Sequence, residues 1–137
     1  MVYAVVTGGG TSGHVIPAIA ICELLTEAGH QVSDIRYVGS RRGVERELMK
    51  STQIESEYLP ISGLQRSWSF QGMSRNVLLP WRLLRSRVLA RGLLKLWNPS
   101  VVVSVGGYAS EPMSRAALAS NVPLVCVSYD RTPGLAT

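Results

Sequence analysis

Residues 8–14 read Gly-Gly-Gly-Thr-Ser-Gly-His, a set of residue types that could bind an anion and move a proton. They follow an apolar run, Val2–Thr7, that is typical of a buried parallel strand, and they precede a stretch with helical spacing of apolar residues. Glycine lets the backbone approach a ligand closely, and the first turn of a helix offers N–H groups without an intrahelical partner. The pattern therefore predicts a site for a phosphate or a pyrophosphate.

His14 follows this turn directly and falls in the first turn of the predicted helix. The N–H dipoles of that turn disfavour a charged imidazolium, so we expect a neutral ring. A neutral imidazole can take a proton from a hydroxyl group. Two interpretations stay open: His14 is a general base, or it is a residue that caps the helix or orients a substrate.

A second glycine turn, Gly106-Gly107, follows the apolar run Val101–Val105 and comes before another predicted helix. If the two strands are neighbours, both turns face one cleft, and together they suit a pyrophosphate better than a single phosphate. The alternative for this turn is an ordinary bend between a strand and a helix.

Residues 8–13 also satisfy the dinucleotide-binding spacing Gly-x-Gly-x-x-Gly. That interpretation needs an acidic residue at the end of the second strand, whereas Asp34 lies at the start of that strand. Arg41 and Arg42 follow the strand and would suit a 2′-phosphate, so an NADP-dependent reductase domain stays an alternative. The lysine-containing phosphate loop of nucleotide triphosphatases is absent from the sequence.

The chain has a net charge of +5 and carries no acidic residue from Tyr58 to Ser110. Apolar, aromatic and basic side chains alternate there, a combination that an anionic membrane surface would contact. The predicted contact residues are Trp68, Phe70, Arg75, Leu78, Leu79, Trp81, Arg82 and Arg85. One alternative is a core helix whose arginines extend into water. Another is nucleic-acid binding, but no recognised nucleic-acid motif is present, so we expect no such partner.

The 137 residues correspond to about one domain, which is long enough to bury a core. No apolar stretch approaches the ~20 residues of a membrane-spanning helix. Cys22 and Cys126 lack the spacing of a zinc site and suggest a reducing compartment, so we expect neither a metal nor a disulfide framework.

Strands and helices are expected to alternate along the chain. Strands are predicted over Val2–Thr7, Gln31–Val38, Ile54–Ile61, Val101–Val105 and Pro123–Ser128. Helices are predicted over His14–Ala28, Arg42–Ser51, Arg75–Trp97 with a kink at Pro80, and Pro112–Ala119. This order predicts an α/β fold, a Rossmann-like parallel sheet with helices on both faces and ligands at the carboxyl ends of the strands.

Four segments resemble, in order and spacing, the amino-terminal domain of the MurG family of glycosyltransferases. They are residues 8–17, residues 61–64, residues 106–112 and residues 130–137, the last of which resembles actinobacterial members. The resemblance implies the first half of a GT-B enzyme, with residues 1–137 as the acceptor- and membrane-binding Rossmann-like domain. The nucleotide-sugar-binding domain of the family is not in this sequence.

The activity that the resemblance implies is inverting transfer of N-acetylglucosamine from UDP-GlcNAc to the 4-hydroxyl of the muramyl sugar of lipid I, which forms lipid II. The partners are then UDP-GlcNAc, lipid I and an anionic membrane surface, at the cytoplasmic face of the cell membrane and without a cofactor. The alternative is a non-catalytic module of a split glycosyltransferase that binds a lipid pyrophosphate or anchors a partner chain.

The resemblance also assigns roles to single residues. His14 is implied to assist deprotonation of the acceptor. Donor binding is implied for Thr11, Ser12, Gly13 and Asp130, and acceptor pyrophosphate binding for Gly10, Gly13, Gly106, Gly107, Tyr108 and Ser110. The family has His-Glu-x-Asn where this chain has Val127-Ser128-Tyr129-Asp130. An ionised carboxylate accepts but does not donate hydrogen bonds, so Asp130 would contact the donor differently.

Overall fold

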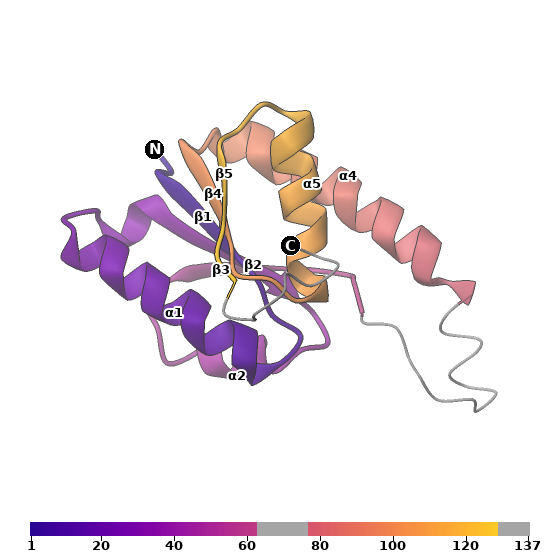
Figure 1. Cartoon of the computed structure of the whole chain (residues 1–137), viewed down its shortest axis with the longest axis horizontal. Helices are drawn as coiled ribbons and strands as arrows, with labels where there is room; N and C mark the ends of the chain where they lie inside the picture. The colour runs from indigo at the N-terminus through magenta and orange to yellow at the C-terminus, as the bar shows by residue number, and fades with distance from the viewer. Residues whose placement is uncertain (63–76, 129–137) are drawn as a thin grey trace.

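The computed structural model describes residues 1–62 and 77–128. Its strands form one parallel sheet in the order β3-β2-β1-β4-β5 (Figure 1). They are β1 Ala4–Thr7, β2 Ile35–Ser40, β3 Glu55–Leu59, β4 Val101–Ser104 and β5 Leu124–Cys126. This is the strand order of a Rossmann-type sheet, in which the direction of chain winding reverses between β1 and β4. The predicted fold class is confirmed.

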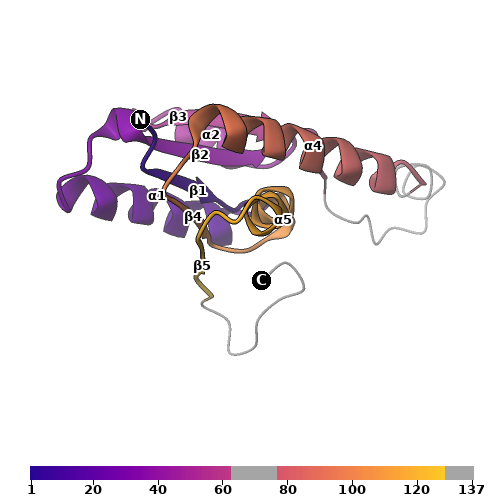
Figure 2. The same ribbon diagram turned by 90° about the horizontal axis from the view of Figure 1, so that it is seen from above.

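Helices cover both faces of the sheet, as Figures 1 and 2 show. On one face lie α1 (Ser12–Glu27) and α2 (Glu45–Met49), and on the other lie α4 (Leu79–Trp97) and α5 (Glu111–Ala119). Short 3₁₀ turns occur at Val32–Asp34 and Tyr108–Ser110. The sheet is therefore the middle layer of three.

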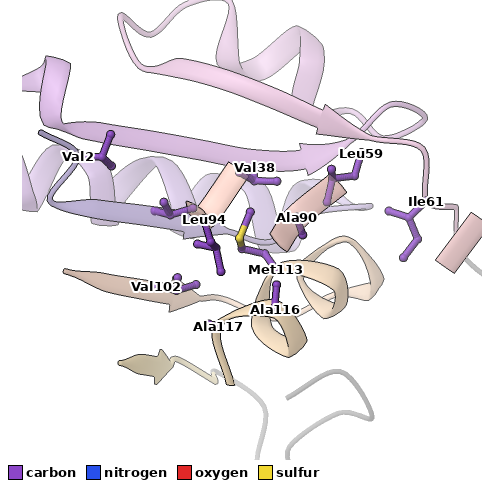
Figure 3. Close-up of a cluster of buried hydrophobic side chains, with 11 residues drawn as sticks. Val2, Val38, Leu59, Ile61, Ala90, Leu94, Val102, Met113, Ala116 and Ala117 are labelled. Atoms are coloured by element: carbon purple, nitrogen blue, oxygen red, sulfur yellow. The ribbon is translucent and has the colours of Figure 1, made fainter. Parts of the chain in front are cut away.

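The core alternates along β1, because successive strand residues point to opposite faces of a sheet. Val5 packs with Val38, Val102 and Met113 on the side of α4 and α5 (Figure 3). Val6 packs on the other side, with the buried residues Ala18 and Cys22 of α1. Since both faces are covered, β1 is wholly buried, which explains why its sequence is a continuous apolar run.

Helix α4 packs against the core through a narrow stripe of Ser86, Ala90 and Leu94, which lie four residues apart. Pro80 lies in the first turn, where its missing N–H has no helical partner to lose, so the predicted kink is not found there. Asn98 ends the helix in the left-handed conformation, with φ of 45°.

Three predicted elements differ from those observed. The second strand begins only at Ile35, because the residues before it form a 3₁₀ turn. The helix predicted over Arg42–Ser51, with Val44, Leu48 and Met49 facing inward, is shorter. Met49 is buried and Leu48 is half-buried, but Val44 is exposed and Glu45 is buried in its place. The last strand, β5, is short and lies at the sheet edge, where Val125 and Cys126 are exposed rather than buried.

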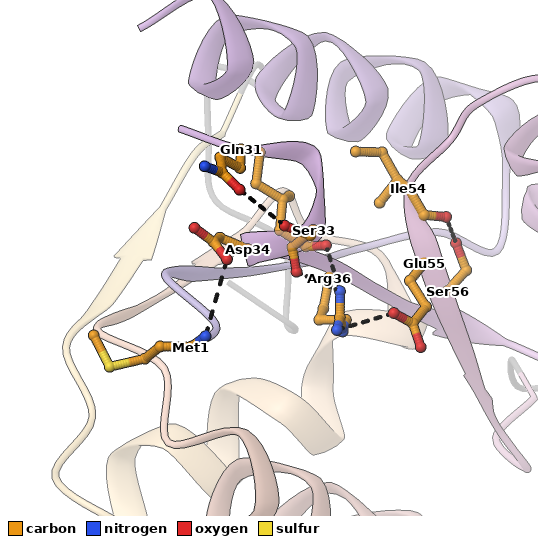
Figure 4. A network of polar contacts seen from close by, with 9 residues as sticks. Met1, Gln31, Ser33, Asp34, Arg36, Ile54, Glu55 and Ser56 are labelled. Atoms are coloured by element: carbon orange, nitrogen blue, oxygen red, sulfur yellow. Dashed lines mark hydrogen bonds and ion pairs between the residues drawn. The ribbon is translucent and has the colours of Figure 1, made fainter. Parts of the chain in front are cut away.

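Polar contacts gather at the amino ends of β2 and β3 (Figure 4). Arg36 forms an ion pair of 2.9 Å with Glu55, and its Nη1 donates to the Ser33 carbonyl at 2.8 Å. Asp34 lies 4.0 Å from the amino group of Met1. Asp34 thus lies at the opposite edge of the sheet from the glycine turns, too far to act as the ribose ligand of a dinucleotide.

Within the described segments, no helix combines the length and the apolar character that crossing a membrane requires.

The two cysteines are expected to differ in reactivity. Burial raises the pKa of the Cys22 thiol to about 12, whereas Cys126 is exposed. Since the thiolate is the reacting species, iodoacetamide at pH 8 should alkylate Cys22 at least about a hundredfold more slowly than Cys126. Mass spectrometry of the native and the denatured chain measures both rates, and equal rates in the native chain would contradict the buried position of Cys22.

The same burial makes stability depend on pH. The folded-state pKa of Cys22 lies above its ordinary value of 9.0. Its contribution to the unfolding free energy is therefore complete below about pH 9 and is lost as the pH rises toward 12. Urea unfolding of the wild type and of Cys22→Ala at pH 8 and pH 10 should show a smaller fall in stability for the variant.

Candidate functional site

The two glycine turns meet at the carboxyl edge of the sheet. The register of β1 on β4 pairs Thr7 with Ser104, so both strands end at the same level. The Gly9 N–H donates to the Gly106 carbonyl at 3.4 Å, across the gap between the turns. This confirms the prediction that the turns share one edge, and we call Gly8–Gly10 with Gly106–Gly107 the glycine cradle.

Only glycine fits at two positions of the cradle. Gly10 and Gly107 have φ of 94° and 79°, in the left-handed region. A Cβ on Gly107 would lie 2.2 Å from the Gly9 carbonyl oxygen, and a Cβ on Gly10 would lie 2.2 Å from the ring of Tyr108. The backbones of the two turns are therefore as close as their atoms allow.

Thr11 directly precedes helix α1, at the N-cap position, but its side chain does not cap the helix. Its backbone is extended, and its Oγ1 lies 3.0 Å from Nδ1 of His14 instead of bonding a backbone N–H. The N–H groups of His14 and Val15 both donate to the Thr11 carbonyl. Ser12 and Gly13, which come before them, have no acceptor within the helix, so their N–H groups are available to an anion.

The imidazole of His14 lies beside the second glycine turn. A Cβ on Gly107 would be 3.3 Å from Cγ of His14, so a larger residue there would crowd the ring. Thr11 occupies Nδ1, which leaves Nε2 for a ligand. When Nδ1 carries the proton and donates to Thr11, Nε2 can accept a proton; in the other tautomer Nε2 is a donor.

The first glycine turn rests on two residues that the sequence reasoning missed. The Tyr37 hydroxyl donates to the Gly8 carbonyl. The carboxylate of Glu45, which is fully buried, accepts from the Gly10 N–H at 3.3 Å to each oxygen and from the Ser40 N–H at 2.8 Å. Burial, and then the charge of Glu45, raise the pKa of Tyr37 well above its usual range, so the phenol stays a donor.

One signal in the sequence could have revealed that Glu45 faces inward. Met49 was correctly predicted to face inward, and Glu45 precedes it by four residues, which places both on one face of a helix. Val44 was chosen in its place because it is apolar.

The second turn is held in place by side chains of the residues that follow its glycines. Ser110 is buried, and its hydroxyl donates to the Gly107 carbonyl at 2.9 Å. The Tyr108 hydroxyl lies 3.4 Å from Oγ of Ser40, which ties this turn to the end of β2. Of the residues predicted to bind a pyrophosphate, Tyr108 and Ser110 thus also brace the cradle through their side chains.

The outer face of α4 carries several exposed apolar side chains. Trp81, Leu84 and Val88 are 66%, 55% and 62% exposed, and helical geometry puts them opposite the buried Ser86 and Ala90. Leu78 is exposed as predicted, but Leu79 is half-buried, since it lies four residues before Leu83, which packs on the core.

Arginines surround the first turn of α4. Arg41 and Arg42, which follow β2, line a hollow of about 280 Å³ together with Leu78, Trp81, Arg82 and Arg85. None of the ion pairs among residues 1–62 and 77–128 involves these arginines. Of the residues predicted for a membrane contact, Leu78, Trp81, Arg82 and Arg85 are therefore brought together at this end of the helix.

Four predicted site residues lie outside the described segments: Trp68, Phe70, Arg75 and Asp130. In the part of the chain that the structure describes, no group of three or more His, Cys, Asp or Glu residues is placed to hold a metal ion.

Curated relatives match almost the whole chain. The UDP-N-acetylglucosamine--N-acetylmuramyl-(pentapeptide) pyrophosphoryl-undecaprenol N-acetylglucosamine transferase of Desulforamulus reducens is 35% identical over 132 residues, which are 96% of this chain and 34% of the relative. The enzyme of the same name from Lachnospira eligens is 38% identical over 132 residues, with 96% and 35% covered. The chain thus spans about a third of the length of these relatives.

Solved structures show the same fold. The crystal structure of Acinetobacter baumannii MurG superposes with a TM-score of 0.80 at 23% identity, over 99% of this chain and 37% of that one. UDP-GlcNAc 2-epimerase from Neisseria meningitidis, bound to UDP-GlcNAc, superposes with a TM-score of 0.58 at 14% identity, over 93% of this chain and 32% of that one.

A family model gives the assignment. The model described as the glycosyltransferase family 28 N-terminal domain matches residues 4–137. That range includes both glycine turns, His14, and all of α4. The chain therefore belongs to the family of glycosyltransferase family 28 N-terminal domains.

Proposed function

We propose that this chain is the acceptor-binding half of an inverting glycosyltransferase. The reaction is transfer of N-acetylglucosamine from UDP-GlcNAc to the 4-hydroxyl of the muramyl sugar of lipid I, which forms lipid II for peptidoglycan. The observation that carries this proposal is the position of His14 beside a cradle built from two glycine turns. The names of the relatives, which join an N-acetylglucosamine transferase to a muramyl pyrophosphoryl acceptor, support the substrate class.

The acceptor pyrophosphate would bind at the cradle. Free N–H groups at the start of α1, including that of Gly13, and the positive end of the helix dipole favour an anion there. Gly10, Gly106 and Gly107 have no side chain between their backbone and the ligand, and Tyr108 and Ser110 keep the turns in place.

His14 would act as the general base. Its Nε2 takes the proton of the 4-hydroxyl while that oxygen forms a bond to C1 of N-acetylglucosamine, and the bond from C1 to the UDP oxygen breaks on the opposite face. The Thr11 hydroxyl would accept a hydrogen bond from Nδ1–H and so stabilise the imidazolium that forms. The leaving diphosphate would be stabilised by N–H groups at helix starts, with Thr11, Ser12, Gly13 and Asp130 near the donor.

Most of the donor site would belong to a second domain. The curated relatives are about three times as long as the segment that this chain covers. We assign recognition of the uridine and its ribose to the part of these relatives that lies outside the segment matched by this chain. By itself, the 137-residue chain should then be inactive and bind UDP-GlcNAc weakly.

The outer face of α4 would contact an anionic membrane surface, so that the protein is peripheral at the cytoplasmic face. The exposed stripe of Trp81, Leu84 and Val88 lies next to Arg82 and Arg85. Apolar side chains of this kind enter the region between headgroups and acyl chains, and each basic residue near an anionic surface contributes about 1 kcal/mol. Nucleic acid is not proposed as a partner.

Replacing His14 with alanine should lower turnover by about 10²–10⁴-fold, the usual contribution of a general base. The assay measures transfer of labelled N-acetylglucosamine to lipid I by the chain joined to the carboxyl-terminal domain of the Desulforamulus reducens relative. Vesicle binding should stay unchanged.

The control is His30→Ala, because His30 stacks on Tyr3 at the amino edge of the sheet, with 3.7 Å between the ring centres. Turnover of His14→Ala within twofold of the wild type would remove His14 from the chemistry. It would favour the non-catalytic module that binds a lipid pyrophosphate.

Replacing Thr11 with valine, which has nearly the same shape, should lower kcat by about 10–150-fold, because a hydrogen bond to a charged imidazole is worth about 1.5–3 kcal/mol. Thr11→Ser should restore kcat, since it keeps the hydroxyl. Steady-state kinetics in the same assay measure both, and equal kcat for the valine and serine variants would show that the contact between Thr11 and His14 has no part in turnover.

Replacing both Trp81 and Leu84 with alanine should weaken binding to vesicles rich in phosphatidylglycerol by at least about tenfold. The reason is that each apolar side chain removed from water contributes about 1.5–3 kcal/mol. Sedimentation with vesicles of phosphatidylglycerol or phosphatidylcholine gives the affinities. Leu96→Ala is the control, because Leu96 is exposed near the other end of α4. Binding that depends on neither lipid charge nor Trp81 would exclude the membrane contact.

A further inference from the structure

Glu45 is an unusual residue to bury. Its side chain is fully inaccessible to solvent, although it is a carboxylate. None of the ion pairs found in residues 1–62 and 77–128 includes it. A buried charge without a cation is unfavourable unless hydrogen bonds replace the lost water. Its partners must therefore supply that compensation.

The partners are backbone N–H groups from the ends of two neighbouring strands. Oε1 accepts from Ser40, the last residue of β2, at 2.8 Å, and both oxygens accept from Gly10, just beyond β1, at 3.3 Å. The carboxylate thus links the end of β2 to the first glycine turn. It occupies these N–H groups as a bound anion would.

Glycine residues make the space for this carboxylate. A Cβ on Gly43 would lie 1.6 Å from Oε2, and a Cβ on Gly9 would lie 2.7 Å from Oε1. Gly10 is held on a second side by the ring of Tyr108. The Gly10 peptide is therefore fixed between a carboxylate and an aromatic ring.

We propose that Glu45 is a positioning residue that fixes the Gly10 peptide, and with it the shape of the glycine cradle, for the lipid-linked pyrophosphate of the acceptor. The identity of the ligand in this proposal rests on the proposed function. The link between Glu45 and Gly10 does not, because it is a contact within the chain. In this role Glu45 does not touch the substrate. It determines how the first turn presents its backbone.

The test compares Glu45→Gln with Glu47→Gln, a control on the same helix whose side chain pairs with Lys50 at the surface. Glutamine keeps the shape of glutamate but offers one acceptor oxygen, which the shorter bond to Ser40 will retain. In ¹H–¹⁵N spectra of the 137-residue chain, the Gly10 amide should shift upfield and exchange with solvent about tenfold faster or more. The Ser40 amide should change little.

A second variant tests the same link without touching Glu45. Gly43→Ala places a methyl group where Oε2 now lies, and Gly43 does not have a positive φ, so alanine can adopt its backbone. Its methyl should displace the carboxylate and perturb the Gly10 amide as Glu45→Gln does. Glu45→Asp keeps the charge on a shorter side chain and should have an intermediate effect.

Kinetics separate positioning from simple support of the fold. In the transferase assay, Glu45→Gln should raise KM for lipid I about tenfold while KM for UDP-GlcNAc stays within twofold, and Glu45→Asp should recover part of the loss. A melting temperature that falls without a change in KM for lipid I would overturn the proposal. So would Gly10 amides in Glu45→Gln and Gly43→Ala that match the wild type.

If the wild-type chain joined to the carboxyl-terminal domain of the relative transferred no N-acetylglucosamine, the proposed function would be contradicted instead. The Gly10 amide measurements on the 137-residue chain would still decide the role of Glu45.

Discussion

The parallel pairing of β1 with β4 is the constraint on which the rest of the structure depends. After β3 the chain returns across the sheet, so that β4 lies beside β1 rather than beside β3. The register then ends both strands at the same level, and the turn after each must pass within contact distance of the other. Glycine at positions 10 and 107 follows from this closeness, and so does the position of His14 beside the second turn.

The sequence was sufficient for the features that depend on local backbone chemistry. An apolar run followed by glycine and a helical pattern marks the end of a buried parallel strand, so β1, β4 and their turns could be predicted. That both turns lie at the carboxyl ends of the strands followed from the parallel sheet, but their meeting was predicted only on the condition that the two strands are neighbours. His14 was found for the same reason, because it adjoins the first turn.

The parts that could not be predicted depend on contacts between distant residues. Nothing near Glu45 in the sequence indicates that its partner is Gly10, 35 positions away. Thr11 was assigned to the donor, and its contact with His14 depends on a cap geometry that residue type alone does not determine. Strand β5 has an apolar sequence yet lies at an edge, and its exposure depends on what packs beside it.

Helix α4 has a consequence for the reach of the molecule. Its second half is held against α5, whereas its first turns extend past the sheet (Figure 1). At 1.5 Å per residue its 19 residues form a rigid rod about 28 Å long. Trp81 lies near the start of this rod, in the hollow that Arg41 and Arg42 line just beyond the end of β2. Under the proposed function, the rigid packing of α4 would thus fix how far a membrane-held sugar has to extend to reach His14.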